Sequence, residues 1–85
     1  MDKLEEYRKQ MSEIDQKIAS LFLTRMDLSI QIGNYKKEKN IPIYQEEREK
    51  IVLENIKKLT LKKKEQEYLE DFFLYLMSKS KEVQK

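Results

Sequence analysis

The chain has 85 residues, 40% of them charged, and its 18 basic and 16 acidic side chains give a net charge of +2. A chain of this length forms one domain at most and buries only roughly 60% of its unfolded surface, so residues 1–85 are expected to form a single domain. One glycine is too few for a phosphate-binding loop, and the lack of histidine and cysteine excludes the usual zinc sites, thiol nucleophiles and imidazole bases.

Charge and hydropathy also limit the partners. The nearly balanced charge disfavours bulk binding of nucleic acid. The charged start of the sequence lacks a secretory hydrophobic region, and the longest apolar run, Leu21 to Leu23, is far too short to cross a membrane. We therefore expect a soluble cytoplasmic protein with no nucleic-acid or membrane partner.

The first predicted element is a long helix from Lys3 to Lys39, with Asn40 as its C-terminal cap before Pro42. Its apolar residues recur at alternating steps of three and four, as in a coiled-coil seam. These are Leu4, Tyr7, Met11, Ile14, Ile18, Leu21, Leu28, Ile32 and Tyr35. The single charged residue on this seam is Arg25.

The length of this helix predicts a partner chain. At 1.5 Å per residue it would be about 54 Å long, whereas a compact chain of this size has a radius of gyration of about 12 Å and is about 30 Å across. The helix must therefore project beyond its own chain and lay its apolar seam on another surface. The simplest such surface is a second copy, which predicts a homodimer.

Two further helices are predicted after a short connection, Asn40 to Gln45. The second begins at Glu46, where acidic residues suit the positive end of a helix, and its apolar face is formed by Ile51, Val52, Ile56 and Leu59. A lysine-rich junction, Thr60 to Lys64, leads to a third helix from Lys64 to Val83. The inner face of that helix is formed by Leu69, Phe72, Phe73, Leu76 and Met77. The fold class is thus all-α, with a long, a short and a medium helix.

Polar residues interrupt two of these apolar faces. Arg25 on the first seam needs compensation because burying an unpaired guanidinium is costly; it either sets the register of a helix pair or lines a polar site. Lys36 points within about 20° of Arg25 around the helix. The stripe of the third helix continues into Ser80 and Gln84, which indicates either the wall of a pocket or a fraying end. By themselves, Arg8, Arg48 and Glu49 are ordinary exposed charges.

Taken together, the polar positions match a known pattern. It comprises Leu4-x-x-x-Arg8, Ile14-Asp15, Arg25, Lys36, Pro42-Ile43, Glu47-Arg48-Glu49 and Ser80-x-x-x-Gln84. Over essentially the whole chain this order and spacing resembles the all-helical chorismate mutases. The resemblance implies that two three-helix chains interlock into a homodimer with two active sites. It also implies the pericyclic conversion of chorismate to prephenate in aromatic amino-acid biosynthesis, with no cofactor or metal.

The resemblance further implies a set of substrate-binding residues. One chain would supply Arg25, Lys36, Gln45, Arg48, Glu49, Ser80 and Gln84, and the other chain would supply Arg8. Helix geometry agrees with this last assignment, because Arg8 and Arg25 are about 25 Å apart along one helix. They can share a small site only if an antiparallel partner brings its own Arg8 to it.

Each of these residues has an implied role. The three arginines would hold the two substrate carboxylates through forked hydrogen bonds, and Arg25 would act with Lys36 and Gln84 in catalysis. Lys36 and Gln84 would donate to the ether oxygen, where negative charge grows in the transition state. Glu49 would accept from the ring hydroxyl, and Ser80 would assist a carboxylate. Gln45 stands where the family usually has aspartate, so a carboxylate contribution is lost and a cost in affinity is expected.

The sequence leaves three alternative functions open. An isochorismate pyruvate lyase would use the same fold and a similar cationic pocket, although Glu49 argues against it, and product analysis with each substrate separates the two. A non-catalytic helical dimerisation module would explain the seam but leave Arg25, Lys36 and Gln84 as coincidences; it would show no saturable binding of a bicyclic transition-state analogue. A nucleic-acid-binding coiled coil is disfavoured by the near-balanced charge.

Overall fold

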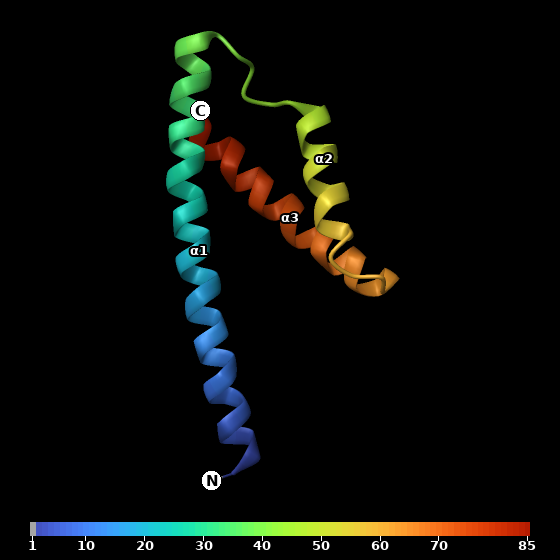
Figure 1. The fold of residues 1–85 in the computed structure, drawn as a ribbon. Helices are drawn as coiled ribbons and strands as arrows, with labels where there is room; N and C mark the ends of the chain where they lie inside the picture. The colour runs from blue at the N-terminus through green and yellow to red at the C-terminus, as the bar shows by residue number, and fades with distance from the viewer. Residues whose placement is uncertain (1) are drawn as a thin grey trace.

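The computed structural model describes residues 2–85 as three helices (Figure 1). Helix α1 spans Lys3–Lys39, α2 spans Glu46–Lys57 and α3 spans Lys63–Gln84, and this part of the chain contains no strand. The predicted all-helical, long-short-medium architecture is confirmed. Within residues 2–85, no helix is both long and apolar enough to span a bilayer.

Both ends of α1 are capped by side chains or backbone geometry that the sequence supplies. The Asp2 carboxylate accepts a hydrogen bond from the backbone N–H of Leu4 at 3.2 Å, which satisfies one of the free N–H groups of the first turn. Asn40 adopts the left-handed conformation with φ of 56°. The N–H of Ile41 then donates to the carbonyl of Lys36 at 2.8 Å, which closes the last turn. The predicted cap at Asn40 is confirmed.

The molecule is elongated, because α1 extends far beyond the other two helices. It measures 57 × 27 × 15 Å with a radius of gyration of 16.4 Å, against about 12 Å for a compact chain of this length. Helix α3 packs against both α2 and the C-terminal half of α1, while the N-terminal half of α1 stands alone (Figure 1). The seam residues of this projecting half are between 49% and 69% exposed: Leu4, Tyr7, Met11, Ile14, Ile18 and Leu21.

The buried centre of the chain lies where α3 crosses α1. Its apolar part is small, consisting of Leu76 and Met77 on α3. Three polar side chains, Ser29, Ser80 and Gln84, are buried beside them. This is a thin core with polar groups built into it, as expected of a short chain whose third helix turns from an apolar to a polar stripe.

Gly33 allows the two helices to approach closely at this crossing. A Cβ atom at this position would lie 2.7 Å from the Cα of Gln84, a distance that two carbon atoms cannot adopt without displacing the helix. Glycine inside a helix is less favourable than alanine by roughly 1 kcal/mol. The close crossing with the end of α3 offsets that cost.

We therefore expect Gly33→Ala to destabilise the chain by about 1–3 kcal/mol through overpacking, although glycine-to-alanine changes inside helices usually stabilise. The neighbouring substitution Asn34→Ala is the matched control, because Asn34 is exposed on the same turn. Urea unfolding monitored by circular dichroism measures both. A stabilised Gly33→Ala variant would contradict the close crossing.

The junction between α2 and α3 is ordered by one glutamine. The Gln66 amide nitrogen donates to the carbonyl of Lys57, the last residue of α2, at 3.2 Å and to that of Thr60 in the junction at 3.0 Å. Leu59, predicted on the apolar face of the second helix, lies beyond this end and is 76% exposed. That prediction was wrong because α2 ends two residues before Leu59, at Lys57, whose carbonyl is bound by Gln66.

Candidate active site

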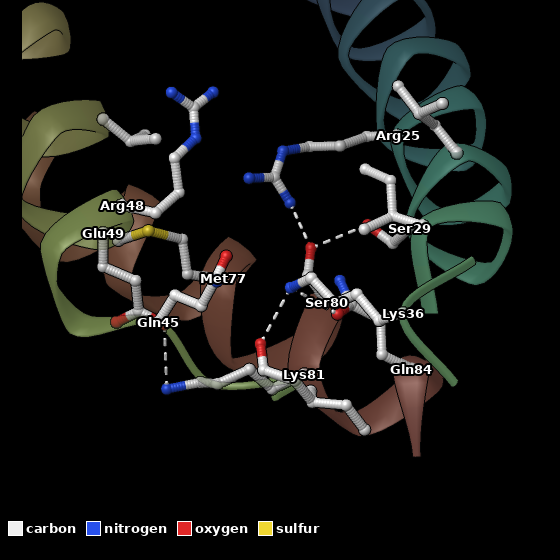
Figure 2. Close-up of a pocket in the computed structure, with 14 residues that line it drawn as sticks. Arg25, Ser29, Lys36, Gln45, Arg48, Glu49, Met77, Ser80, Lys81 and Gln84 are labelled. Carbon is white, nitrogen blue, oxygen red and sulfur yellow. Dashed lines mark hydrogen bonds and ion pairs between the residues drawn. The ribbon is translucent and has the colours of Figure 1, made fainter. Parts of the chain in front are cut away.

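A cavity of about 350 Å³ lies between α1, α2 and the C-terminal half of α3 (Figure 2). This volume is within the roughly 300–1,000 Å³ range of small-molecule sites. Every helix and the connection between α1 and α2 contribute to it. Its lining residues are Arg25, Leu28, Ser29, Ile32, Lys36, Ile43, Gln45, Arg48, Glu49, Val52, Met77, Ser80, Lys81 and Gln84.

Seven of the eight residues expected at the site line this one cavity. They are Arg25, Lys36, Gln45, Arg48, Glu49, Ser80 and Gln84. The eighth, Arg8, is exposed on the projecting half of α1 and does not reach the cavity of its own chain. This separation agrees with the helix geometry, which puts Arg8 about 25 Å from Arg25 along the axis.

Arg25 reaches from α1 onto α3. Its Nη1 donates to the hydroxyl of Ser80 and to the carbonyl of Leu76, the latter at 3.3 Å. Partial burial lowers the pKa of Arg25 from its ordinary value, yet an arginine keeps its charge at all ordinary pH values. Hydrogen bonds to α3 therefore compensate the Arg25 charge on the apolar seam. The other N–H groups of the guanidinium are left for a ligand.

Lys36 and Gln84 form the second polar pair across the α1–α3 crossing. The Lys36 ammonium donates to the carbonyl of Ile43 at 2.9 Å and to Oε1 of Gln84 at 3.3 Å. Because lysine only donates, the Gln84 amide must turn its oxygen toward Lys36 and leave its NH2 group for another acceptor. Gln84 is only 7% exposed, so the prediction of a frayed end is wrong and that of a pocket wall is confirmed.

The free NH2 group of Gln84 belongs to a residue that lines the cavity. It donates to no group within residues 2–85. No fully buried side-chain polar atom in that part of the chain lacks a hydrogen-bond partner, so this nitrogen is not sealed off. The cavity thus presents two adjacent donors, the Lys36 ammonium and the Gln84 amide, to one region of a bound ligand.

The first turn of α2 forms the opposite wall. Arg25 and Arg48 extend into the space between α1 and α2 from opposite sides (Figure 2). The Glu49 carboxylate is ion-paired with Lys81 of α3 at 3.2 Å. The Lys81 ammonium also lies 4.6 Å from the centroid of the Tyr44 ring, within the range of cation–π attraction. Lys81 was not among the predicted site residues.

Three residues of this region were missed from the sequence: Ser29, Gly33 and Lys81. A signal existed for the first two, since Arg25, Ser29 and Gly33 follow one another at steps of four and so share a helix face. No local signal marks Lys81, because its ion pair joins α3 to α2.

The charges of the cavity define its ligand class. Four cationic side chains, Arg25, Lys36, Arg48 and Lys81, face a single carboxylate, Glu49. Such a surplus of positive charge in a partly enclosed space favours a small molecule with more than one negative group. The fold and the cavity therefore define an all-helical protein with a cationic site for a small polyanion.

Comparison with known proteins identifies the family. A family model described as chorismate mutase type II matches residues 7–85, and the chain belongs to this family. The chain is similar to a chorismate mutase from Methanocaldococcus jannaschii, with 41% identity over 59 residues that cover 69% of this chain and 60% of that protein. It is also similar to a bifunctional chorismate mutase/prephenate dehydratase from Aquifex aeolicus, with 39% identity over 59 residues that cover 69% of this chain and 16% of that protein.

A solved structure shares the whole fold. A conserved hypothetical protein from Pyrococcus furiosus superposes with a TM-score of 0.83 at 30% identity, covering 100% of this chain and 99% of that one. The length and order of the three helices are therefore matched from end to end. The aligned segments of the two named relatives span less than two thirds of each, 60% and 16%.

Proposed function

We propose that this chain catalyses the rearrangement of chorismate to prephenate, a step toward the aromatic amino acids. Membership of the chorismate mutase type II family supports this, as does the name of the relative from Methanocaldococcus jannaschii. The observation that carries the proposal is the cavity itself, in which donors from α1 and α3 converge opposite the first turn of α2.

The reaction suits the chemistry of the cavity. Within one molecule, the ether C–O bond breaks as a C–C bond forms, so no group leaves and no external nucleophile or base is needed. The protein must hold a flexible dianion in its folded conformation and stabilise the negative charge that develops on the ether oxygen. Positioning of this kind is worth up to about 7–11 kcal/mol in favourable cases, and one well-aimed donor about 3 kcal/mol.

The donors divide between the two tasks. The Arg25 and Arg48 guanidinium groups would bind the substrate carboxylates from opposite sides of the cavity, and the Ser80 hydroxyl would add a further hydrogen bond to one of them. Lys36 and the free NH2 group of Gln84 would donate to the ether oxygen. This assignment is supported by the 3.3 Å contact between Lys36 Nζ and Gln84 Oε1, which aligns both groups side by side.

The hydroxyl end of the substrate would face α2. Glu49 would accept a hydrogen bond from the ring hydroxyl, and Gln45 would contact the same region without the negative charge usual at its position. The ion pair with Lys81 supports this role, because it holds the Glu49 carboxylate in one orientation beside the cavity.

Two copies of the chain would complete the site. The exposed apolar seam on the projecting half of α1 continues into an apolar groove of about 440 Å³ between α1 and α3, lined in part by Ile18, Leu21, Phe22, Phe72 and Leu76. An antiparallel α1 from a second copy would cover both and bring its Arg8 toward the cavity. In a single chain the apolar seam of α1 would be exposed to water, which is unfavourable for a stripe of this length.

The dimer leads to a prediction about mass. Because the seam of α1 is unpartnered within one chain, sedimentation equilibrium at micromolar concentration is expected to give twice the chain mass of 10.4 kDa. Replacing the exposed Met11 and Ile14 with glutamate places like charges on the seam and is expected to yield monomers. A wild-type monomer would contradict this arrangement and leave Arg8 without a route to the cavity.

The proposed activity is tested directly with purified protein. Chorismate absorbance is expected to fall, with prephenate as the product and no release of pyruvate. A bicyclic dicarboxylate that mimics the transition state is expected to bind saturably and to raise the unfolding temperature, since it binds only the folded state. Pyruvate release from isochorismate without prephenate formation would instead identify a lyase, and absence of both turnover and analogue binding would identify a non-catalytic module.

Lys81 offers a prediction about substrate binding. Replacing it with glutamine leaves the Glu49 carboxylate unpaired beside an incoming dianion and removes one cation from the cavity. We expect KM to rise about five- to tenfold, with a smaller change in kcat, because the loss applies to the bound substrate and its transition state alike.

Lys79 is the matched control for this change. It lies on the same helix, is ion-paired with Glu82 at 3.1 Å and lies 5.6 Å from the Tyr75 ring, but it is not part of the cavity. Lys79→Gln is therefore expected to leave KM within about twofold of wild type. Equal KM values for the two variants would remove Lys81 from the binding site.

A further inference from the structure

Ser29 makes a buried hydrogen bond that the substrate-binding set does not include. It lies on α1, one turn after Arg25 and one turn before Gly33. Its hydroxyl donates to Oγ of Ser80 on α3 at 2.9 Å. Ser29 is 5% exposed and Ser80 is 8% exposed, so this pair is shielded from bulk water and its geometry is set by the helix crossing.

Proton counting at Ser80 shows what this bond does. A serine hydroxyl has two acceptor lone pairs and one proton to donate. Ser80 Oγ accepts one hydrogen bond from Ser29 and a second from Nη1 of Arg25. With both lone pairs occupied, the Ser80 hydroxyl has only its own proton left to donate. The acceptor of that proton must be a group other than Ser29 and Arg25.

The cavity is where that acceptor would lie. Ser29, Ser80 and Arg25 all line it, and the nearest protein donors point at Ser80 rather than away from it. A hydroxyl whose rotation is fixed as a donor beside a guanidinium is well suited to a carboxylate oxygen, because both groups then donate to the same anion. A hydroxyl free to rotate would spend part of its time presenting a lone pair to that anion.

We propose that Ser29 is a positioning residue of the active site, which fixes the Ser80 hydroxyl as a donor toward a substrate carboxylate. The inference rests on the proposed chorismate mutase function and adds to it a residue that touches Ser80 and not the reacting atoms. Ser29 acts through Ser80 alone, so its contribution disappears when Ser80 has no hydroxyl.

The test is a double-mutant cycle on kcat/KM for chorismate. Ser29→Ala removes only the hydroxyl and is expected to lower kcat/KM about five- to thirtyfold, in line with weakening one hydrogen bond to a charged group. In a Ser80→Ala background the same change is expected to have no further effect within about twofold. The Ser78→Ala variant, an exposed serine on α3, is the matched control and should behave as wild type.

The possible outcomes separate a positioning role from a packing role. If Ser29 only fills space between α1 and α3, its removal costs as much in the Ser80→Ala background as in wild type, and this result overturns the inference. An unchanged kcat/KM for Ser29→Ala in the wild-type background also overturns it. Melting temperatures of all four proteins show whether any loss follows from unfolding. A wild-type protein without mutase activity overturns the proposed function and this inference together, whereas an active wild type with additive losses overturns the inference alone.

Discussion

Replacing Gln84 with glutamate is expected to lower the catalytic rate by about two to three orders of magnitude at pH 7.5, comparable to the loss of one transition-state donor. The amide of Gln84 carries its donor protons at any ordinary pH. A glutamate can donate only when protonated, and at neutral pH it would present a negative charge to the ether oxygen of a dianion.

The rate of this variant is expected to recover as the pH falls. Burial at position 84 favours the neutral carboxyl and raises its pKa, whereas the Lys36 ammonium favours the ionised form and lowers the pKa. Whichever effect prevails, the protonated fraction increases tenfold for each pH unit of decrease above that pKa. The ratio of Gln84→Glu to wild-type activity should therefore rise as the pH falls from 8 to 5, and level off once the pH is below that pKa.

Gln84→Ala is the control, since it has no donor at any pH. Its activity relative to wild type is expected to stay low and flat over the same range. Rates are measured from chorismate loss at saturating substrate, in buffers of constant ionic strength. A Gln84→Glu variant with a constant ratio to wild type across pH 5 to 8 would show that this position donates nothing to the ether oxygen.

The helices could be predicted well from the sequence because apolar spacing and capping residues act over a few positions. The spacing of apolar residues marks α1, and Asp2 and Asn40 cap it with bonds that involve residues only a few positions away. The end of α2 was misplaced for the opposite reason. Gln66, which lies nine residues after Lys57, captures the carbonyl of that residue, and helix periodicity carries no information about such a contact.

The candidate site divides in the same way. Arg25 and Lys36 could be placed on one face of the first helix from their spacing, and Ser80 and Gln84 on one face of the third. Their hydrogen bonds to one another join residues about fifty positions apart, so only the fold reveals that these faces meet. The grouping into one site came from the resemblance to a family pattern and not from helix geometry.

Gly33 shows the limit of reasoning from one helix at a time. Within α1 it is an unfavourable residue. Its spacing from Arg25 and Ser29 shows which face of the helix it shares, but not why that position is a glycine. A glycine is required at this position because the backbone of Gln84 on α3 leaves no room for a side chain. Gly33, which permits the crossing, and Gln84, which would donate at the site, are thus in contact although they are far apart in the sequence.

The second large effect expected is on mixing two inactive chains. Arg8→Ala and Arg25→Ala should each reduce kcat/KM by about two to three orders of magnitude, since each removes a guanidinium that would pair with a substrate carboxylate. The two residues lie far apart on α1, and only Arg25 lines the cavity of its own chain. If Arg8 serves the site of the partner chain, a dimer of one Arg8→Ala chain and one Arg25→Ala chain has one site that carries both lesions and one that carries neither.

Co-expression of the two variants with different affinity tags isolates this mixed dimer by sequential purification. It is expected to have about half the activity of the wild-type dimer, and an unfractionated equal mixture about one quarter, because half of its dimers are mixed and each has one intact site in two. If Arg8 instead acted on the cavity of its own chain, every site in the mixed dimer would lack one arginine and no activity would return. Tandem purification proves that the two chains are together, so a silent mixed dimer could only mean that the site is not shared between them.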